Sequence, residues 1–285
     1  MPTPQWREPT ADVERQWGFD PSAAPPWLMV GVGQSKAMLL QFASGKVVRP
    51  VNERIAAITE QPPDPQGRFF FIDGRSPSST RIEVRDPRTQ ALEATLAVSV
   101  KRKKRQTISF LFVEDQARDR TTRSPDIVDG LIDELNSIYE NQTNITFESR
   151  GFADVKVDID LGDVVFKGWE AKTRTWTGEP ITLQRPWREI VRRGDKGADF
   201  NVFFVPSESF DEPLVFTQDN NCVFEDGAQL VDVLLPHEIG LAFGCSPTAD
   251  FNQAHHLMFS FTSNPNINPR NGNFIPKACA NIMNP

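Results

Sequence analysis

The placement of β-forming and helix-forming runs constrains the fold of this 285-residue chain more than any other feature. From Trp27 to about Lys101, short β-type runs recur at intervals of about 8–14 residues, with Gly, Pro, Asp and Ser between them. The clearest runs are Ala37–Phe42, Arg54–Thr59, Arg68–Ile72, Thr80–Val84 and Ala94–Val100. This pattern predicts an antiparallel β-sandwich over residues 27–106. Residues 1–26 are rich in proline and lack periodicity, which predicts an extended arm.

The remaining part, residues 107–285, interleaves strand-like runs with helical periodicity. Ser124-Pro125-Asp126 is a helix start, and apolar residues then recur at helical spacing as far as Ile138. Two more helices are predicted near residues 186–193 and at Pro276–Met283. Strands are predicted at Ile108–Val113, Asn144–Phe147, Asp154–Leu161, Phe200–Val205 and Asn220–Asp226. Alternating strands and helices predict an α/β or α+β domain here, and an α+β protein overall.

Charge and cysteine content exclude several classes of protein. The net charge of −7 argues against nucleic acid or an anionic membrane as the main partner. The basic run Lys101–Arg105 is interpreted as a strand end or domain junction rather than a phosphate-binding patch. Cys222, Cys245 and Cys279 are too few for a disulfide scaffold, and they form either one bridge and a thiol or three buried thiols.

The sequence contains no targeting or membrane signal that we recognise. No stretch approaches the roughly 20 apolar residues that span a bilayer, and residues 1–20 lack the pattern of a signal peptide. We therefore expect no membrane span and leave the compartment open, with export, if it occurs, by a route without a cleaved signal.

The run Leu235-Pro236-His237-Glu238-Ile239-Gly240-Leu241-Ala242-Phe243-Gly244 carries the strongest chemical signal. In the H-E-x-x-H motif two histidines at positions i and i+4 share one helix face and hold Zn²⁺, with the glutamate as general base. His237 and Glu238 match this motif, but Leu241 stands where the second histidine is expected.

The order of elements around this motif resembles the metzincin clan of zinc peptidases over residues 107–285. The matching pieces are the first strand, the long helix, an edge-like strand at residues 201–205, Gly244 seven residues after His237, and His256-Leu257-Met258 in place of the clan's methionine-bearing turn. Residues 27–106 resemble a bacterial immunoglobulin-like domain in pattern only. The clan's third zinc ligand would fall at Pro247, so two ligand positions are occupied by residues that cannot bind zinc.

The resemblance implies a zinc-dependent metalloendopeptidase with a divergent or disabled metal site. A divergent Zn²⁺ site would use His237 with His255 or His256 and with Asp250, and Glu238 would be the catalytic base for a polypeptide substrate. Since Tyr139 lies on the distant first helix, an arginine of residues 185–193 would replace a tyrosine oxyanion helper. The alternative is a non-catalytic pseudopeptidase whose former cleft binds a peptide or protein partner.

Simpler interpretations of the same residues remain open. His237-Glu238 is then a chance pair on a surface helix, Leu241 and Met258 are core residues, His255-His256 is a polar loop pair and Asp250 is a turn residue. A third functional class is a structural or delivery protein that binds through the N-terminal sandwich.

Overall fold

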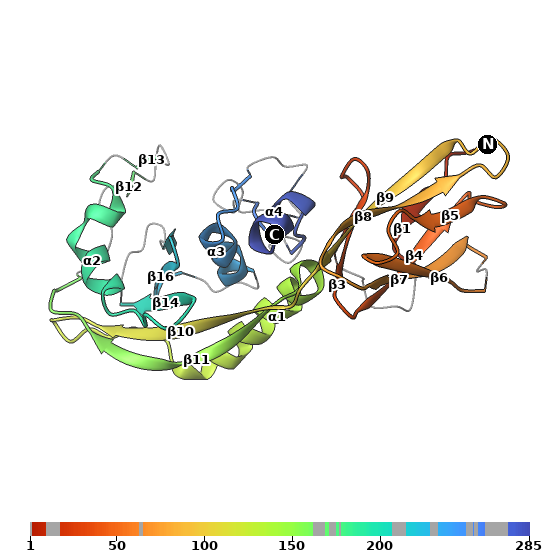
Figure 1. Cartoon of the computed structure of the whole chain (residues 1–285). Coiled ribbons are helices and arrows are strands. Elements are labelled where there is room, and N and C mark those ends of the chain that lie inside the picture. Colours follow the sequence, from red (N-terminus) through yellow and green to blue (C-terminus); the bar gives the residue numbers. More distant parts are fainter. Residues whose placement is uncertain are drawn as a thin grey trace. The chain divides into compact units, whose positions relative to one another are not determined.

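The computed structural model combines a strand-rich N-terminal part with a mixed α/β part (Figure 1). It describes residues 2–9, 18–62, 65–161, 169–170, 175–176, 178–206, 215–228, 233–248, 253, 256–259 and 273–285. Its contacts divide the chain into two compact units. Unit 1 consists of Met1–Lys104, Ile138–Ile145 and Phe274–Pro285, and unit 2 of Arg105–Ser137 and Thr146–Asn273. The domain boundary expected at residues 106–107 and the arm expected over residues 1–26 stay predictions.

Unit 1 is built on two β-sheets. One has the strand order β1-β4-β7-β6 and the other β2-β3-β9-β8-β5, and only β3 and β9 pair in parallel. The strands are β1 (Gln5–Arg7), β2 (Phe19–Asp20), β3 (Trp27–Gly31), β4 (Ser35–Gln41), β5 (Val47–Pro50), β6 (Ala56–Glu60), β7 (Arg68–Gly74), β8 (Ser78–Arg85) and β9 (Leu92–Lys101). The five strands predicted from alternating runs are therefore confirmed.

Alternation along β8 shows why these residues form a strand. Ile82 and Val84 are fully buried and belong to a core that also includes residues of the facing sheet, such as Met38. Glu83 points the other way, between Arg81 and Arg85, whose Nε atoms lie 3.0 and 2.8 Å from its carboxylate oxygens. The ion pair with Arg85 lowers the pKa of Glu83. One face of the strand thus packs in the core while the other is polar.

Two buried lysines of unit 1 hold the C-terminal ends of two helices, α1 (Val128–Thr143) and α4 (Lys277–Met283). Lys36 Nζ donates to the Asn141 carbonyl oxygen at 2.5 Å, and Lys101 Nζ donates to the carbonyl oxygen of Asn284. Cations are favourable at helix C-termini because the last carbonyl groups lack intrahelical partners. Lys101 ends β9, so the basic run that it begins lies at a strand junction, as the sequence indicated.

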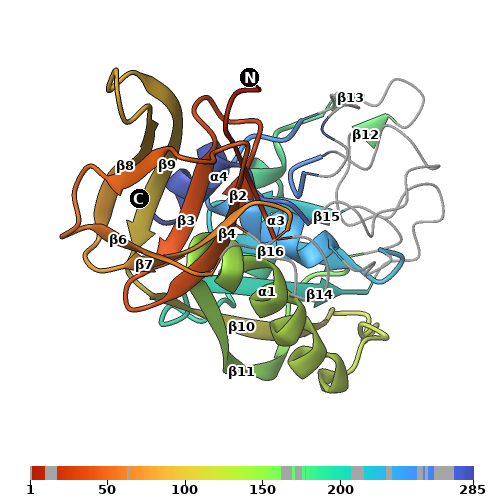
Figure 2. The same cartoon turned by 90° about the vertical axis from the view of Figure 1, so that its right-hand side faces the viewer.

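Unit 2 contains a mixed five-stranded sheet of order β11-β10-β14-β16-β15. The strands β10, β14 and β16 are parallel, and β15 is antiparallel to β16. Helix α1 runs alongside β10 and β11 in both views (Figures 1 and 2), and Asn136 on α1 exchanges two hydrogen bonds with the backbone of Phe147. The strands are β10 (Lys104–Glu114), β11 (Ile145–Lys156), β12 (Trp169–Glu170), β13 (Thr175–Trp176), β14 (Phe200–Val205), β15 (Val215–Gln218) and β16 (Asn221–Glu225).

The helices of unit 2 pack on this sheet. Helix α2 buries Trp187 and Ile190 in a cluster with Phe203 and Val223, which project from one face of the sheet. Helix α3 packs against β15 and β16. Besides α1, the helical segments are η1 (Pro125–Ile127), η2 (Ile181–Leu183), α2 (Arg185–Val191) and α3 (Leu234–Ala242). No helix in the described parts of the chain is long and apolar enough to cross a membrane.

Two sequence predictions for unit 2 are wrong in detail. The strand expected at the sheet edge, Asn201–Val205, is β14 and lies between β10 and β16. All six of its residues are buried, as expected of a strand covered on both faces. The strand expected at Asp154–Leu161 ends at Lys156. Beyond it the chain leaves the strand ladder, and the Leu161 N–H donates to the carboxylate of Asp115 in the loop after β10.

Candidate functional site around helix α3

Helix α3 begins and ends where its sequence dictates. Pro236 lies in the first turn, where a missing N–H removes no intrahelical hydrogen bond. At the other end Gly244 has φ of +90°, Gly244 N–H donates to the Leu241 carbonyl oxygen, and Cys245 N–H donates to that of Gly240. This pair of bonds defines a Schellman cap, which favours glycine because other residues are strained at positive φ. The chain therefore reverses direction one turn after the His-Glu pair.

His237 and Glu238 are buried, so the His-Glu pair does not lie on a surface helix. Their exposed fractions are only 7% and 6%. His237 Nδ1 lies 2.7 Å from the carbonyl oxygen of Leu257. Because a carbonyl oxygen only accepts, Nδ1 donates, and the neutral ring then carries its lone pair on Nε2. Metal-binding histidines are commonly oriented by this type of bond to a backbone carbonyl.

The carboxyl group of Glu238 is directed to the sheet. Thr217 Oγ1 on β15 donates to Glu238 Oε2 at 2.5 Å, and Thr217 lies opposite Cys222 in the β15–β16 register. Burial raises the pKa of Glu238, while the neighbouring His237 and the Thr217 hydroxyl lower it only in part. Burial also raises the pKa of the Cys222 thiol, although its hydrogen bond with Thr217 lowers that pKa in part, and an ionised Glu238 raises it again. Burial therefore disfavours the charged form of each group.

The predicted Met-turn residues lie in a turn that contacts His237. Phe259 N–H donates to the His256 carbonyl oxygen at 3.0 Å, closing a four-residue turn, and Thr248 N–H donates to the Met258 carbonyl oxygen at 2.8 Å. Leu257 and Met258 are buried, with His256 partly exposed. The structure thus brings His237 and the 256–259 turn together through Leu257. The assigned roles of His256 and Met258 stay predictions.

The donor set does not fit a catalytic zinc ion within the described residues. Such a site needs three protein ligands, and α3 supplies one imidazole, since Leu241 stands one turn after His237 and Pro247 is exposed beyond the helix. Across the described residues no three His, Cys, Asp or Glu side chains are grouped so that they could hold a metal ion. Asp250 and His255 lie outside the described residues.

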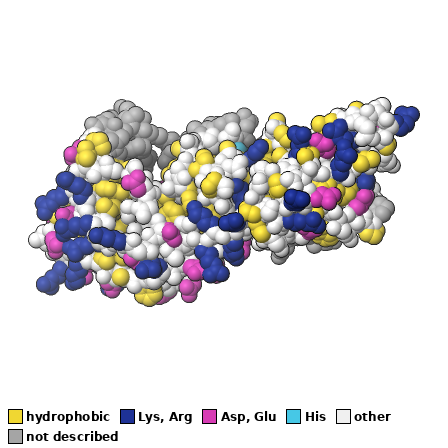
Figure 3. Space-filling view, in the orientation of Figure 1, with side chains coloured by type: hydrophobic (Ala, Val, Ile, Leu, Met, Phe, Trp, Pro, Cys, Tyr) yellow, Lys and Arg dark blue, Asp and Glu magenta, His cyan; other side chains and the backbone are white. Residues whose placement is uncertain are grey.

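Other residues considered for catalysis lie in different settings. Tyr139 is fully buried in α1. Arg192 and Arg193, next to α2, both pair with Asp158, at 3.2 and 2.8 Å. In Figure 3 Lys and Arg side chains gather on the side of unit 2 that holds α2, with Asp and Glu side chains among them. Trp187 of α2 packs on Phe216 of β15. The structure records no contact that would assign these arginines to Glu238.

Sequence reasoning missed Thr217 and Cys222. Thr217 belongs to the short segment Val215–Gln218, which precedes the turn at Asp219-Asn220. The alternation of Val215, Phe216 and Thr217 is too short to be recognised as a strand in the sequence. No local signal relates Thr217 to Glu238, since the two are 21 residues apart in the chain.

Comparisons with known proteins give distant likenesses to two solved structures. No model of a known protein family matches the chain, and no curated protein matches it. Metalloproteinase-II from Bacteroides fragilis is a solved structure that is 10% identical, with a TM-score of 0.37, over 90% of this chain and 84% of that one. Domains 4 and 5 of the S-layer protein SbsC are 16% identical, with a TM-score of 0.19, over 26% of this chain and 46% of that one. At these values neither likeness assigns an activity.

Proposed function

We propose that unit 2 is a metzincin-type peptidase domain with a disabled metal site, and that this chain binds a polypeptide without cleaving it. In the same proposal the sheets of unit 1 form an immunoglobulin-like sandwich. The observation that carries the proposal is the environment of α3, where His237 and Glu238 keep the buried positions of a peptidase motif while Leu241 replaces a ligand.

The environment of Glu238 supports the loss of catalysis. A general base must be ionised and must face the water that it activates. Glu238 is buried with a raised pKa, and one of its oxygens accepts a hydrogen bond from Thr217. A buried carboxyl group whose oxygen is hydrogen-bonded to the sheet acts as a structural element, which supports the loss of its role as a base.

The sheet beside α3 supports a polypeptide as the partner. Strand β15 is the last strand of the described sheet and pairs on its inner side with β16. The outer side of an edge strand presents backbone N–H and C=O groups that pair with an extended peptide. Val215, Phe216 and Thr217 are partly exposed, so their side chains are accessible to such a partner.

A divergent zinc peptidase is the second candidate, and the orientation of His237 favours it. The bond from Nδ1 to the Leu257 carbonyl oxygen orients the ring as in metal-binding histidines, and His256 adjoins Leu257 in the chain. The remaining ligands would be His255 or His256 with Asp250.

Proteolysis and binding assays on the purified chain separate the two candidates. Wild-type protein and Glu238→Gln are incubated with an unfolded protein substrate at neutral pH, with added zinc and with a chelator. We expect no cleavage above background and equal retention of the unfolded polypeptide by both proteins. Val84→Ala, a core variant in unit 1, controls for general loss of stability.

Cleavage that requires zinc and disappears in Glu238→Gln would refute the proposal and establish the second candidate. His255→Ala and His256→Ala would then identify the ligand, because only the variant that removes a ligand loses both zinc and activity. Failure of the wild-type chain to retain any polypeptide would refute the binding part of the proposal.

A further inference from the structure

The outer face of one sheet of unit 1 carries a cluster of arginines. Arg81, Glu83 and Arg85 alternate along β8 with the core residues of that strand, so their side chains lie on the face away from the core. Arg49 on the neighbouring strand β5 lies directly opposite Glu83 in the antiparallel register. Three guanidinium groups thus surround one carboxylate, with a formal charge of +2 in a chain whose net charge is −7. We call this group the arginine face.

Glu83 holds two of these arginines in place. Its carboxylate oxygens accept hydrogen bonds from Nε of Arg81 at 3.0 Å and from Nε of Arg85 at 2.8 Å, and Glu83 itself is only 4% exposed. Because Arg81 binds through Nε, its two Nη atoms are left for another acceptor, and none is found among the described residues. Arg49 is exposed and has no acceptor in the described part of the chain either. Two guanidinium groups are therefore available to an anion.

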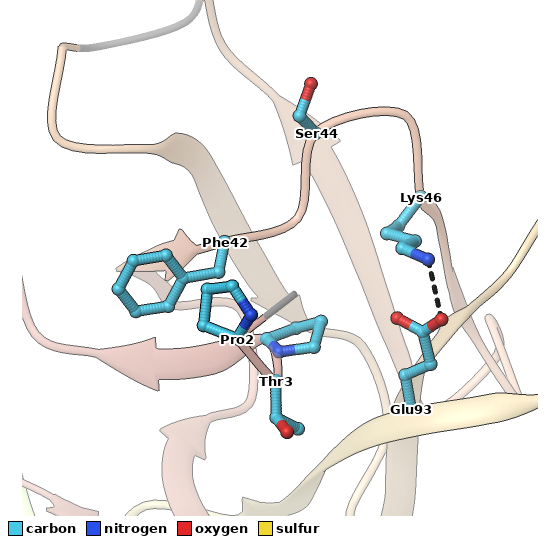
Figure 4. A pocket seen from close by; sticks show the side chains of 7 residues that line it. Pro2, Thr3, Phe42, Ser44, Lys46 and Glu93 are labelled. Atoms are coloured by element: carbon cyan, nitrogen blue, oxygen red, sulfur yellow. Dashed lines mark hydrogen bonds and ion pairs between the residues drawn. The ribbon is translucent and has the colours of Figure 1, made fainter.

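The charged groups at one end of the arginine face form a cluster of their own. Lys46 Nζ lies 2.6 Å from Glu93 and 3.0 Å from Asp86, and Figure 4 shows the Lys46 amine directed to the Glu93 carboxylate. This cluster has a formal charge of −1 and lies beside Arg85, since Asp86 follows it in the chain. It offsets part of the positive charge at this end. An anion therefore meets the strongest positive charge at the opposite end, around Arg81.

Two exposed valines flank the arginines on the same face. Val47 lies opposite Arg85 in the β5–β8 register, and the N–H of Val51 donates to the Arg81 carbonyl oxygen at 2.9 Å. Their exposed fractions are 40% and 53%. Single exposed apolar residues are common, but these two stand on either side of Arg49 at alternate positions of one strand. The face thus offers apolar contact next to anion-binding groups.

We propose that the arginine face binds an acidic segment of a partner polypeptide, with carboxylates of that segment on Arg81 and Arg49 and an apolar side chain against Val51. A carboxylate accepts two parallel hydrogen bonds from one guanidinium, and the Nη atoms of Arg81 have the required fork geometry. Because Glu83 already orients Arg81, little side-chain freedom is lost on binding.

The composition of the face favours a polypeptide over other anions. A sulfated glycan has charge but no apolar side chain to place against Val47 and Val51. A nucleic acid gains most from aromatic rings on which its bases stack, and the described residues of this face include no ring. The arginine face belongs to unit 1 and does not depend on the function proposed for unit 2.

The test is the fluorescence anisotropy of labelled peptides titrated with the full-length protein. The probes are a short peptide in which glutamate alternates with valine, the same peptide with glutamine in place of glutamate, and an unlabelled sulfated oligosaccharide as competitor. We expect the glutamine peptide to bind about tenfold more weakly than the glutamate peptide, because two ion pairs are lost. Added salt should weaken binding of the glutamate peptide. The oligosaccharide, at equal charge, should displace it only at about tenfold higher concentration, because it makes no contact with the valines.

Variants assign the binding to the arginine face. Arg81→Gln and Arg49→Gln each remove one cation, and we expect a loss of affinity of about two- to fivefold for each. Val51→Thr keeps the shape of the side chain but makes it polar, and we expect a loss of about twofold. Arg7→Gln removes an exposed arginine from β1 of the other sheet, and Val32→Thr changes an exposed valine outside the face. Both control variants should leave the affinity unchanged.

Equal binding of the glutamate and glutamine peptides would overturn the proposal, because carboxylates would then play no part. Displacement of the peptide by an equal concentration of the oligosaccharide would assign the face to polyanions in general and overturn the polypeptide part. An equal loss in Arg7→Gln and Arg81→Gln, with both variants folded by circular dichroism, would show attraction by overall charge alone and remove the arginine face as the site.

Discussion

The protein should become more stable as the pH rises from 6.5 to 8.5, because the buried Lys36 amine loses its proton in the folded state over this interval. Lys36 is 7% exposed, and burial lowers its pKa from 10.5 to about 7, although Glu8 opposes this shift. In the unfolded chain the same amine stays protonated up to its ordinary pKa. Between these two values the unfolded state binds more protons than the folded state, so the free energy of unfolding increases with pH.

The size of the effect follows from the two pKa values. A single group with this shift changes the free energy of unfolding by at most about 1.4 kcal/mol per pH unit. The increase between pH 6.5 and 8.5 is then about 2 kcal/mol. Lys101, whose pKa burial lowers to about 8, adds a rise of about 1 kcal/mol in the same interval. Cys222 titrates above this interval in both states, since its ordinary value is 9.0 and burial raises its pKa.

Urea unfolding followed by circular dichroism at pH 6.5, 7.5 and 8.5 measures this dependence. The Lys36→Met variant should keep only the smaller rise that Lys101 contributes. Lys103→Met, which removes a half-exposed lysine paired with Glu140, is the matched control and should keep the full rise. An equal slope in wild type and Lys36→Met would refute the assignment of the effect to this buried amine.

Three further predictions concern α3 and its surroundings. Gly244→Ala should destabilise the protein by about 1–2 kcal/mol in urea unfolding, because alanine is strained at φ of +90°. Gly130→Ala in the first turn of α1 should instead stabilise it by up to about 1 kcal/mol, and equal effects of the two changes would contradict the cap. Thr217→Val removes the donor to Glu238 and should cost about 1–3 kcal/mol; an unchanged unfolding midpoint would argue that the bond does not form. The Cys222 thiol is fully buried with a raised pKa, so iodoacetamide at pH 8 should label it, by mass spectrometry, only after unfolding. Rapid labelling of the native protein would contradict that burial.

Several strands of unit 1 were predictable because apolar and polar residues alternate along their sequences. In β8 the buried Ile82 and Val84 alternate with charged residues, and that period is visible in the sequence alone. The all-buried run of β14 was recognised as a strand, but a run buried on both faces carries no information on its neighbours. Its central place in the sheet depends on parallel pairing with β10 and β16, which no local pattern encodes.

Only those residues of the candidate site that are close together in the sequence were predictable. His237, Glu238 and Gly244 lie on one short helix and its cap, so their spacing reveals their geometry. The contact of Thr217 with Glu238 joins a strand to a helix 21 residues later, and its existence depends on how the sheet and helix pack. The pairing of Lys36 with Asn141 spans 105 residues and is equally invisible in the sequence.

The structure decides between the two states of the three cysteines that the sequence left open, one bridge with a thiol or three buried thiols. Cys222, Cys245 and Cys279 are all buried thiols, so none of them forms the bridge considered from their count. The fold of this chain is therefore held by its cores and hydrogen bonds without a disulfide.

Zinc titration of wild type and Leu241→His side by side, by calorimetry at neutral pH, tests the central account of α3 most directly. The account predicts no saturable binding by the wild-type chain, and weak but saturable binding of one zinc ion by the variant, whose histidines at positions 237 and 241 share a helix face and supply two of the three ligands. Binding of one equivalent by the wild-type chain, with an affinity that Leu241→His does not change, would contradict it.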